Sequence, residues 1–152
     1  MHTIRSLATF TSVLESQGAE AAIHHLNAGV AHRFTAVYRL DGCLLRNVLL
    51  CDKLGQICPE YLAAGPLSTS FCQFVLRDSV FQTTNSVTDH RLDGLPLQGV
   101  VICYHGAPLL SANGELWGTL CHFDLQEMTL SDAEFELQQQ AAKLLPPHLQ
   151  LV

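Results

Sequence analysis

The sequence has few charged residues, no basic cluster and no long apolar run. Charged residues make up 14% of its 152 residues, and the formal net charge is −6 at pH 7. Binding to nucleic acid or to an anionic membrane requires a basic face, but the eight lysines and arginines are scattered along the chain. The longest apolar runs, such as residues 100–103 and 107–110, are far shorter than the roughly 20 residues of a membrane-spanning helix. We therefore expect a soluble protein with no nucleic-acid partner and no membrane partner.

The sequence also shows no signal-peptide pattern, no paired cysteine motif and no established catalytic motif. Its first six residues do not combine a charged segment with an apolar block, so we expect a cytoplasmic protein. No two cysteines have the CxxC spacing of zinc ribbons and thioredoxin-like proteins. A nucleophile elbow, a phosphate-binding loop and an HExxH motif are absent as well. The side chains of Asp89, His90 and Asp93 suit acid–base chemistry, but aspartate in a polar segment favours local turns. We predict no catalytic residue.

The sequence contains six cysteines, although no two of them have CxxC spacing. A chain of this length builds a core without disulfides, so we expect free thiols that behave as small buried apolar side chains. A reactive cysteine would need an electropositive neighbourhood, and only Arg77 and Arg91 are obvious candidates for one. The six residues are Cys43, Cys51, Cys58, Cys72, Cys103 and Cys121.

Helical patterns occupy the two ends of the chain. Residues 3–16 place apolar side chains three to four apart, and Ala19–Ala28 continue with a second apolar face. Ser131 with Glu134 forms a capping box that opens a last helix, which Pro146 ends. Since 48% of the residues are apolar, the chain has enough apolar side chains for a hydrophobic core against which these helices can pack. We expect one compact domain.

The middle of the chain alternates apolar and polar residues with a period of two, which predicts strands. A short helix is expected near residues 71–75, capped by Ser68, Thr69 or Ser70, and the polar segment 85–99 is expected to form a long loop that could bind a ligand. Helices at the ends and strands between them indicate an α+β fold. The predicted strands are 34–40, 44–51, 80–84, 101–110 and 116–124, with hairpin turns at Asp41-Gly42 and Asn113-Gly114.

Two stretches of the sequence resemble the GAF family of sensor domains. The first is Ser70–Val75, of sequence SFCQFV, which Phe81 and Asp89 follow. The second begins with Tyr104–Leu109, of sequence YHGAPL, and continues with Asn113-Gly114, the GTLC of Gly118–Cys121, Asp124 and Leu130-Ser131. The pattern covers roughly residues 18–145, within a single GAF-like domain of residues 1–152.

The resemblance implies a GAF/PAS-like architecture. One central six-stranded antiparallel sheet would carry the N- and C-terminal helices on one face, and a short helix and loops would enclose a ligand pocket on the other. A domain of this kind binds a small molecule in signal transduction without catalysis of its own, pairs into a homodimer through its terminal helices and passes its signal to a partner protein. The implied ligand-binding residues are Phe71, Cys72, Phe74, Asp89, Tyr104, Gly106, Pro108, Leu120 and His122.

The residues themselves support an irregular sheet surface. Gly106 and Gly118 lie inside predicted strands, where glycine marks a bulge or a close backbone approach, and Pro108 cannot donate to the strand ladder. A concave surface of this kind suits a small-ligand site. It equally suits a sheet that curves to close its own core, and the sequence leaves both interpretations open.

The histidines and cysteines of the last hairpin depend on its register. A two-residue turn at Asn113-Gly114 would place His105 opposite His122 and Cys103 opposite Asp124. A three-residue loop would instead place Cys103, His105 and Cys121 on one face with Trp117, Thr119 and Phe123, because a one-residue slip moves every side chain across the sheet. Zinc ligands usually lie on tight turns, so we predict no metal site in either register.

The resemblance also includes relatives with cofactors or catalysis. Bilin-binding relatives use a Cys-His pair, which Cys121-His122 matches in letters but on a strand instead of a helical segment. Heme-binding relatives use a pocket histidine, and no position here is marked for that role. Free methionine sulfoxide reductases use pocket cysteines, but the surroundings of Cys72, Cys103 and Cys121 differ from theirs. We therefore assign no cofactor, and a thiol-based reductase or a degenerate domain that acts only by dimerisation are the alternatives.

Overall fold

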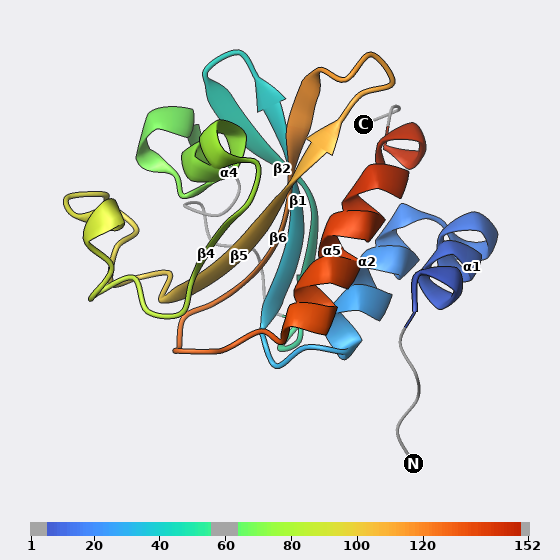
Figure 1. Ribbon diagram of the computed structural model, residues 1–152, viewed down its shortest axis with the longest axis horizontal. Helices are drawn as coiled ribbons and strands as arrows, with labels where there is room; N and C mark the ends of the chain where they lie inside the picture. Colours follow the sequence, from blue (N-terminus) through green and yellow to red (C-terminus); the bar gives the residue numbers. More distant parts are fainter. Residues whose placement is uncertain (1–5, 56–63, 150–152) are drawn as a thin grey trace.

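The computed structural model describes residues 6–55 and 64–149, which form one antiparallel sheet with helices on both faces (Figure 1). Cys58 and the other residues at 56–63 lie outside the described part. Short 3-10 helices occupy Leu67–Thr69, His90–Leu92 and Pro146–His148. The helices are α1 Leu7–Gln17, α2 Ala19–Ala28, α4 Cys72–Asp78 and α5 Asp132–Leu144, and the strands are β1 Phe34–Asp41, β2 Leu44–Asp52, β3 Ala64–Pro66, β4 Phe81–Thr83, β5 Cys103–Leu110 and β6 Leu116–Asp124.

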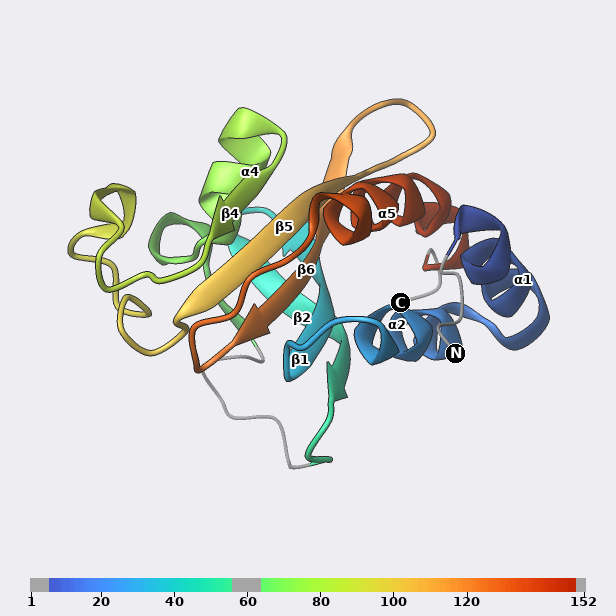
Figure 2. The ribbon, with the colours of Figure 1, turned by 60° about the horizontal axis from the view of Figure 1, so that its bottom comes forward.

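The six strands lie in the order β3-β2-β1-β6-β5-β4, and each neighbouring pair is antiparallel. Helices α1, α2 and α5 gather on one face, whereas α4 and the irregular segments around it lie on the other (Figure 2). The α+β class, the six-stranded sheet and the placement of the terminal helices are therefore confirmed. None of the described helices combines the length and apolar character of a membrane span.

Local sequence explains where the helices begin and end. The Ser6 hydroxyl accepts a hydrogen bond from the amide of Thr9 and opens α1, and Ser131 does the same for Glu134 and opens α5. Gly18 separates α1 from α2 in an extended conformation with φ of 94°, which a residue with a side chain rarely adopts. The predicted bounds of α2 and β6 agree with the structure to the residue.

Three local predictions are wrong. The first hairpin turns at Gly42-Cys43 instead of Asp41-Gly42, since Asp41 pairs with Leu44. No side-chain cap opens α4, because its N-cap position holds Phe71, which has no polar side-chain atom. Strand β3 was not expected, because three residues at a sheet edge leave no alternating pattern.

The last hairpin combines features of both predicted registers. Its loop has three residues between Ser111 and Glu115, with Gly114 at φ of 79°. A bulge at Trp117 then shifts the pairing, because Leu110 faces Leu116 whereas Leu109 faces Gly118. Beyond the bulge, His105 faces His122 and Cys103 faces Asp124.

The sheet separates two clusters of buried apolar residues. Val37, Ala107 and Leu120 point toward α1, α2 and α5 and pack with Phe10, Ile23, Leu137 and Leu145. The opposite face carries Phe34, Tyr104, Cys121 and Phe123, which pack with Phe71, Phe74 and Val75 around α4. The candidate site lies in this second cluster.

Candidate functional site

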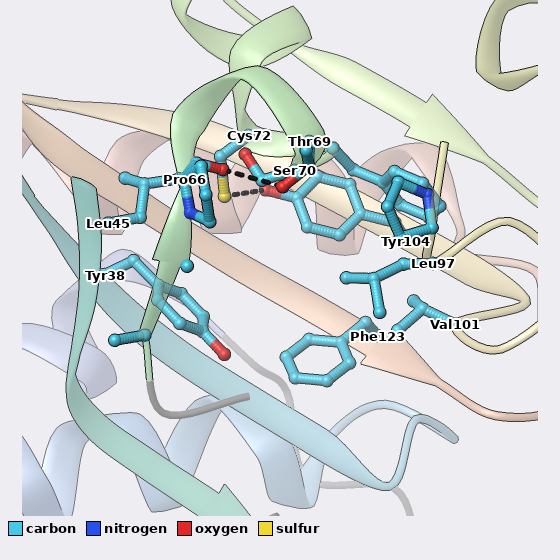
Figure 3. Close-up of a pocket in the computed structure, with 14 residues that line it drawn as sticks. Tyr38, Leu45, Pro66, Thr69, Ser70, Cys72, Leu97, Val101, Tyr104 and Phe123 are labelled. Carbon is cyan, nitrogen blue, oxygen red and sulfur yellow. Dashed lines mark hydrogen bonds between the residues drawn. The ribbon is translucent and has the colours of Figure 1, made fainter. Parts of the chain in front are cut away.

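A cavity of about 220 Å³ lies between the sheet and the segment that joins β3 to α4. Figure 3 shows Tyr38 and Phe123 below this cavity, Thr69 and Ser70 above it, and Leu97 and Val101 on its right. An apolar cavity of about 150 Å³ admits benzene, so this one has room for a larger ring system. Its lining residues are Tyr38, Leu45, Ala64, Gly65, Pro66, Thr69, Ser70, Phe71, Cys72, Pro96, Leu97, Val101, Tyr104 and Phe123.

Aromatic rings form much of the wall. Phe71 meets Tyr104 edge to face, with ring centroids 5.8 Å apart and planes at 88°. Phe123 stacks on Phe34 at 4.9 Å, which holds the ring in place from the side of β1. Packed aromatic pairs of this kind fix the orientation of each ring. The cavity therefore has a stiff, flat-sided wall.

The polar atoms of the wall are neutral. The Cys72 thiol lies 3.0 Å from the Tyr104 hydroxyl and 3.3 Å from the Thr119 hydroxyl. Burial raises the pKa of Cys72 and raises the pKa of Tyr104 well above its usual value, so both groups keep their protons at neutral pH. No lysine, arginine, histidine, aspartate or glutamate occurs among the described residues that line the cavity.

The predicted ligand-binding residues lie in three places: in the cavity wall, behind this wall and away from the cavity. Phe71, Cys72 and Tyr104 line the cavity, as expected for a ligand site. Phe74 lies beside it and stacks on Phe81 at 4.8 Å. Gly106 lies beneath the Tyr104 ring on β5, and Pro108 follows two residues later opposite Thr119. These last three residues support the wall without lining the cavity.

Asp89 lies away from the cavity, in the long loop between β4 and β5. Its carboxylate accepts hydrogen bonds from the amide and guanidinium of Arg91, and this guanidinium lowers the pKa of Asp89 to about 2. The ion pair borders a separate polar surface groove that Gln82 and Thr88 also line. The prediction that Asp89 faces the same pocket as Phe71 is therefore wrong.

Leu120 and His122 lie on the opposite face of the sheet, which corrects their prediction as pocket residues. The register beyond the Trp117 bulge places Thr119, Cys121 and Phe123 on the cavity face and the residues between them on the helix face. Leu120 packs in the helix-face core. His122 lies 2.6 Å through its Nδ1 from the hydroxyl of Thr35.

Three buried histidines meet between the sheet and the helices. His32 Nε2 lies 3.0 Å from His105 Nδ1, and the rings of His32 and His122 are 5.8 Å apart. Burial lowers the pKa of His32 and that of His105 to about 4, so both are neutral at pH 7. Asp124 is engaged elsewhere, since its Oδ2 accepts from the amide of Arg33. Among residues 6–55 and 64–149 no group of three or more histidine, cysteine or acidic side chains is arranged to hold a metal.

The buried thiols are poorly suited to nucleophilic chemistry. Among the described cysteines, Cys51, Cys72, Cys103 and Cys121 are buried and only Cys43 is exposed. Burial raises the pKa of all four buried thiols, that of Cys103 to about 12. Cys121 points to the cavity face but is fully buried. The thiolate, which is the reactive form, is thus disfavoured.

Several lining residues escaped prediction from the sequence. Tyr38 and Phe123 belong to strands that the alternating pattern predicted. The register between these strands places both side chains on the same face of the sheet, so a known register would have identified them. Pro66 comes from β3 and Leu97 from the long loop, neither of which has a periodic pattern, and Val101, predicted as the first residue of a strand, precedes β5 in the structure.

Comparison with solved structures identifies the architecture. The GAF domain of an Acinetobacter phosphoenolpyruvate-protein phosphotransferase superposes with a TM-score of 0.75 at 14% identity, over 95% of this chain and 90% of that one. The chain has the GAF fold. Free methionine-R-sulfoxide reductase from Neisseria meningitidis, solved with its substrate, shares this GAF fold with a TM-score of 0.74 at 13% identity, over 99% and 95% of the two chains.

A further neighbour is longer than this chain. The chromophore-binding domain of the Stigmatella aurantiaca bacteriophytochrome matches with a TM-score of 0.74 at 12% identity, over 96% of this chain and 59% of that one. No protein-family model matches the sequence, and no curated protein matches it significantly. At these identities the comparisons establish the fold.

Proposed function

We propose that this GAF-fold protein is a sensory or regulatory module that binds a small molecule in the cavity and has no catalysis of its own. The observation that carries the proposal is the partly open, mostly apolar cavity on the sheet face opposite the terminal helices. Ligand sites are typically concave and apolar with a few polar groups, and this cavity has that character.

Solved neighbours give independent support. The Neisseria enzyme was solved in complex with its substrate, and the Stigmatella domain is described as chromophore-binding. Both statements concern those proteins. They support the proposal because the same fold there accommodates a small molecule.

The chemistry of the cavity supports a binding role over an enzymatic one. General acid–base catalysis needs a group whose pKa lies near the working pH, and nucleophilic catalysis needs an activated group. The described residues that line the cavity offer only neutral hydroxyls and one thiol, Cys72, whose pKa burial raises. A ligand would therefore meet packing and hydrogen-bonding groups but no reactive one.

A thermal-shift screen of nucleotides, amino acids and neutral metabolites tests the proposal. A ligand at about 100 times its dissociation constant stabilises the folded protein by roughly 2.7 kcal/mol, which raises the melting temperature by several degrees. The variant Leu97→Trp fills the cavity and should abolish the shift, whereas Val100→Trp, at an exposed neighbouring position, should preserve it. A shift that survives in Leu97→Trp would place the ligand elsewhere, and a screen without any hit would contradict the proposal.

A thiol-based reductase remains the second candidate, because Cys72 lines the cavity and two neighbours of this fold are methionine-R-sulfoxide reductases. The test is an assay of free methionine sulfoxide reduction with wild-type protein and the Cys72→Ser variant. Activity that Cys72→Ser abolishes and Cys43→Ser preserves would favour the enzyme. Inactive wild-type protein excludes it.

A further inference from the structure

The cavity lining discriminates against charged ligands. Every described lining residue is neutral, and Arg77 and Arg91 lie outside the lining, over the rings of Phe74 and Phe81. Transfer of an ionised carboxylate or phosphate from water into such a site is costly unless a partner charge receives it. A phosphate ester or a carboxylic acid therefore meets no compensating charge among the described residues of this wall.

The shape of the lining favours a flat ligand. Tyr38, Phe71, Tyr104 and Phe123 surround the space, and the closely packed Phe71–Tyr104 and Phe34–Phe123 pairs restrict ring rotation. With a volume of about 220 Å³, the cavity is larger than an apolar protein cavity of roughly 150 Å³ that binds benzene. It therefore has room for a bicyclic aromatic molecule.

The hydroxyls above the rings act as hydrogen-bond acceptors. The Thr69 hydroxyl donates to the carbonyl of Pro66 at 3.1 Å, and the Ser70 hydroxyl donates to the carbonyl of Leu67 at 3.0 Å. Each hydroxyl has one proton and two lone pairs, so the oxygen atoms remain able to accept. Figure 3 shows both residues at the side of the cavity opposite Tyr38 and Phe123. The ligand that matches them presents an N–H or O–H group.

We propose that the cavity binds an uncharged, planar, mostly apolar molecule of about the size of indole, with one hydrogen-bond donor directed at Thr69 and Ser70. This inference rests on the proposed function and adds the chemical class of the ligand. Indole serves as the probe. Benzofuran has the same shape without the donor, indole-3-carboxylate adds a negative charge and tryptamine adds a positive one.

Isothermal titration calorimetry with these four probes tests the proposal. We expect indole to bind about tenfold more tightly than benzofuran, because a neutral hydrogen bond contributes about this factor. The two charged probes should bind at least tenfold more weakly than indole. Tight binding of tryptamine would instead indicate a cation held by the aromatic rings, and tight binding of indole-3-carboxylate would indicate an unrecognised anion site. Either result overturns the proposal.

The variant Thr69→Val isolates the hydrogen bond. It should lower the affinity for indole to that for benzofuran and leave benzofuran binding unchanged, whereas Thr88→Val on the exposed loop should change neither. Equal loss of both probes would mean that Thr69 acts only through packing, which overturns the donor assignment. All four probes could fail while a charged compound from the thermal-shift screen binds wild type and does not bind Leu97→Trp. In that case the proposed ligand class is wrong and the proposed function stands. If nothing binds in either experiment, both are wrong.

Discussion

Among single residues, Gly118 has the tightest surroundings of the glycines in the described part of the chain. A Cβ atom at this position would lie 1.9 Å from the carbonyl oxygen of Tyr38, on the neighbouring strand β1. Gly106 is crowded as well, because a Cβ atom there would lie 2.6 Å from the Tyr104 ring. Backbone at Tyr38 cannot move without breaking its strand pairing, so residue 118 has to be glycine.

We expect Gly118→Ala to destabilise the protein by about 3 kcal/mol or more, since overpacking against a backbone atom exceeds the usual 1–3 kcal/mol range. Gly65→Ala is the matched control in strand β3, because its added Cβ would meet nothing within 4 Å. That variant should lie within about 0.5 kcal/mol of wild type. Urea unfolding of the three proteins provides the comparison, and similar midpoints for both variants would contradict this view of Gly118.

Residue types could be predicted here more reliably than residue orientations. The sequence marked Gly106 and Gly118 as sites of a bulge or a close backbone approach; backbone approaches Gly118, whereas the side chains of Tyr104 and Val75 crowd Gly106. It did not determine which side chains of β6 face the ligand, because a single extra residue at Trp117 reverses the faces of Leu120 and His122. A bulge of one residue leaves no periodic pattern, so the cavity side of this strand required the structure.

At the scale of elements, the loop that joins α2 to β1 binds the helix layer to the sheet through polar contacts. Lys53, which directly follows β2, donates hydrogen bonds to the carbonyl oxygens of Asn27 near the end of α2 and of Val30 and His32 in this loop. His32 then meets His105 of β5, and both side chains are almost fully buried. The junction therefore holds two neutral imidazoles side by side.

This pair should make stability depend on pH. Burial lowers the pKa of His32 from 6.5 to about 4; the negative charge of Asp124 opposes this shift, and the positive charge of Lys53 adds to it. Burial, together with the neighbouring His32, lowers the pKa of His105 to about 4. The unfolded chain thus binds more protons than the folded one between these values. Stability should be complete above pH 6.5 and fall as the pH drops to about 4, by about 3 kcal/mol for one histidine.

Urea unfolding at pH 7.5, 6.5, 5.5 and 4.5 measures this dependence. The variant His105→Gln removes one of the two buried imidazoles and should flatten the decline, although it lowers stability at pH 7.5. His90→Gln, at a position on the exposed loop, should retain the wild-type profile. A wild-type stability that stays constant from pH 7.5 to 4.5 would show that the pair does not titrate on unfolding.

Elements with strong local signals were predictable, and those without them were not. Caps and apolar periodicity located α2 and α5, and alternation located β1, β2, β5 and β6. Strand β3 depends on pairing with β2 over three residues and has no signal of its own. It contributes Ala64, Gly65 and Pro66 to the cavity, so an unpredicted element forms part of the candidate site.

For the whole molecule, the two faces of the sheet differ in how they are packed. Apolar side chains and the buried histidines fill the space between the sheet and α1, α2 and α5, whereas the face toward α4 also borders the cavity. The central strands have one face in each core, so they connect the two.

We propose that the protein pairs into a homodimer through α1 and α5, as the sequence resemblance implies. In α1 the apolar residues Phe10 and Leu14 point inward, and the exposed residues include Ala8, Ser12 and Glu15. A dimer formed there would join small and polar side chains. Such contacts bury little apolar surface, so we expect a concentration-dependent dimer in place of an obligate one.

Analytical ultracentrifugation over a dilution series tests this expectation. Ser12→Arg places a long charged side chain in the centre of the exposed face of α1 and should shift the protein to the monomer at every concentration. Val87→Arg, on the exposed loop at the opposite side of the sheet, should leave the association unchanged. Leu14→Asp is unsuitable, because this residue is only 2% exposed and the change would unfold the monomer. If Ser12→Arg and wild type dissociate over the same concentration range, α1 does not form the interface. A protein that is monomeric at every concentration would contradict the proposed homodimer.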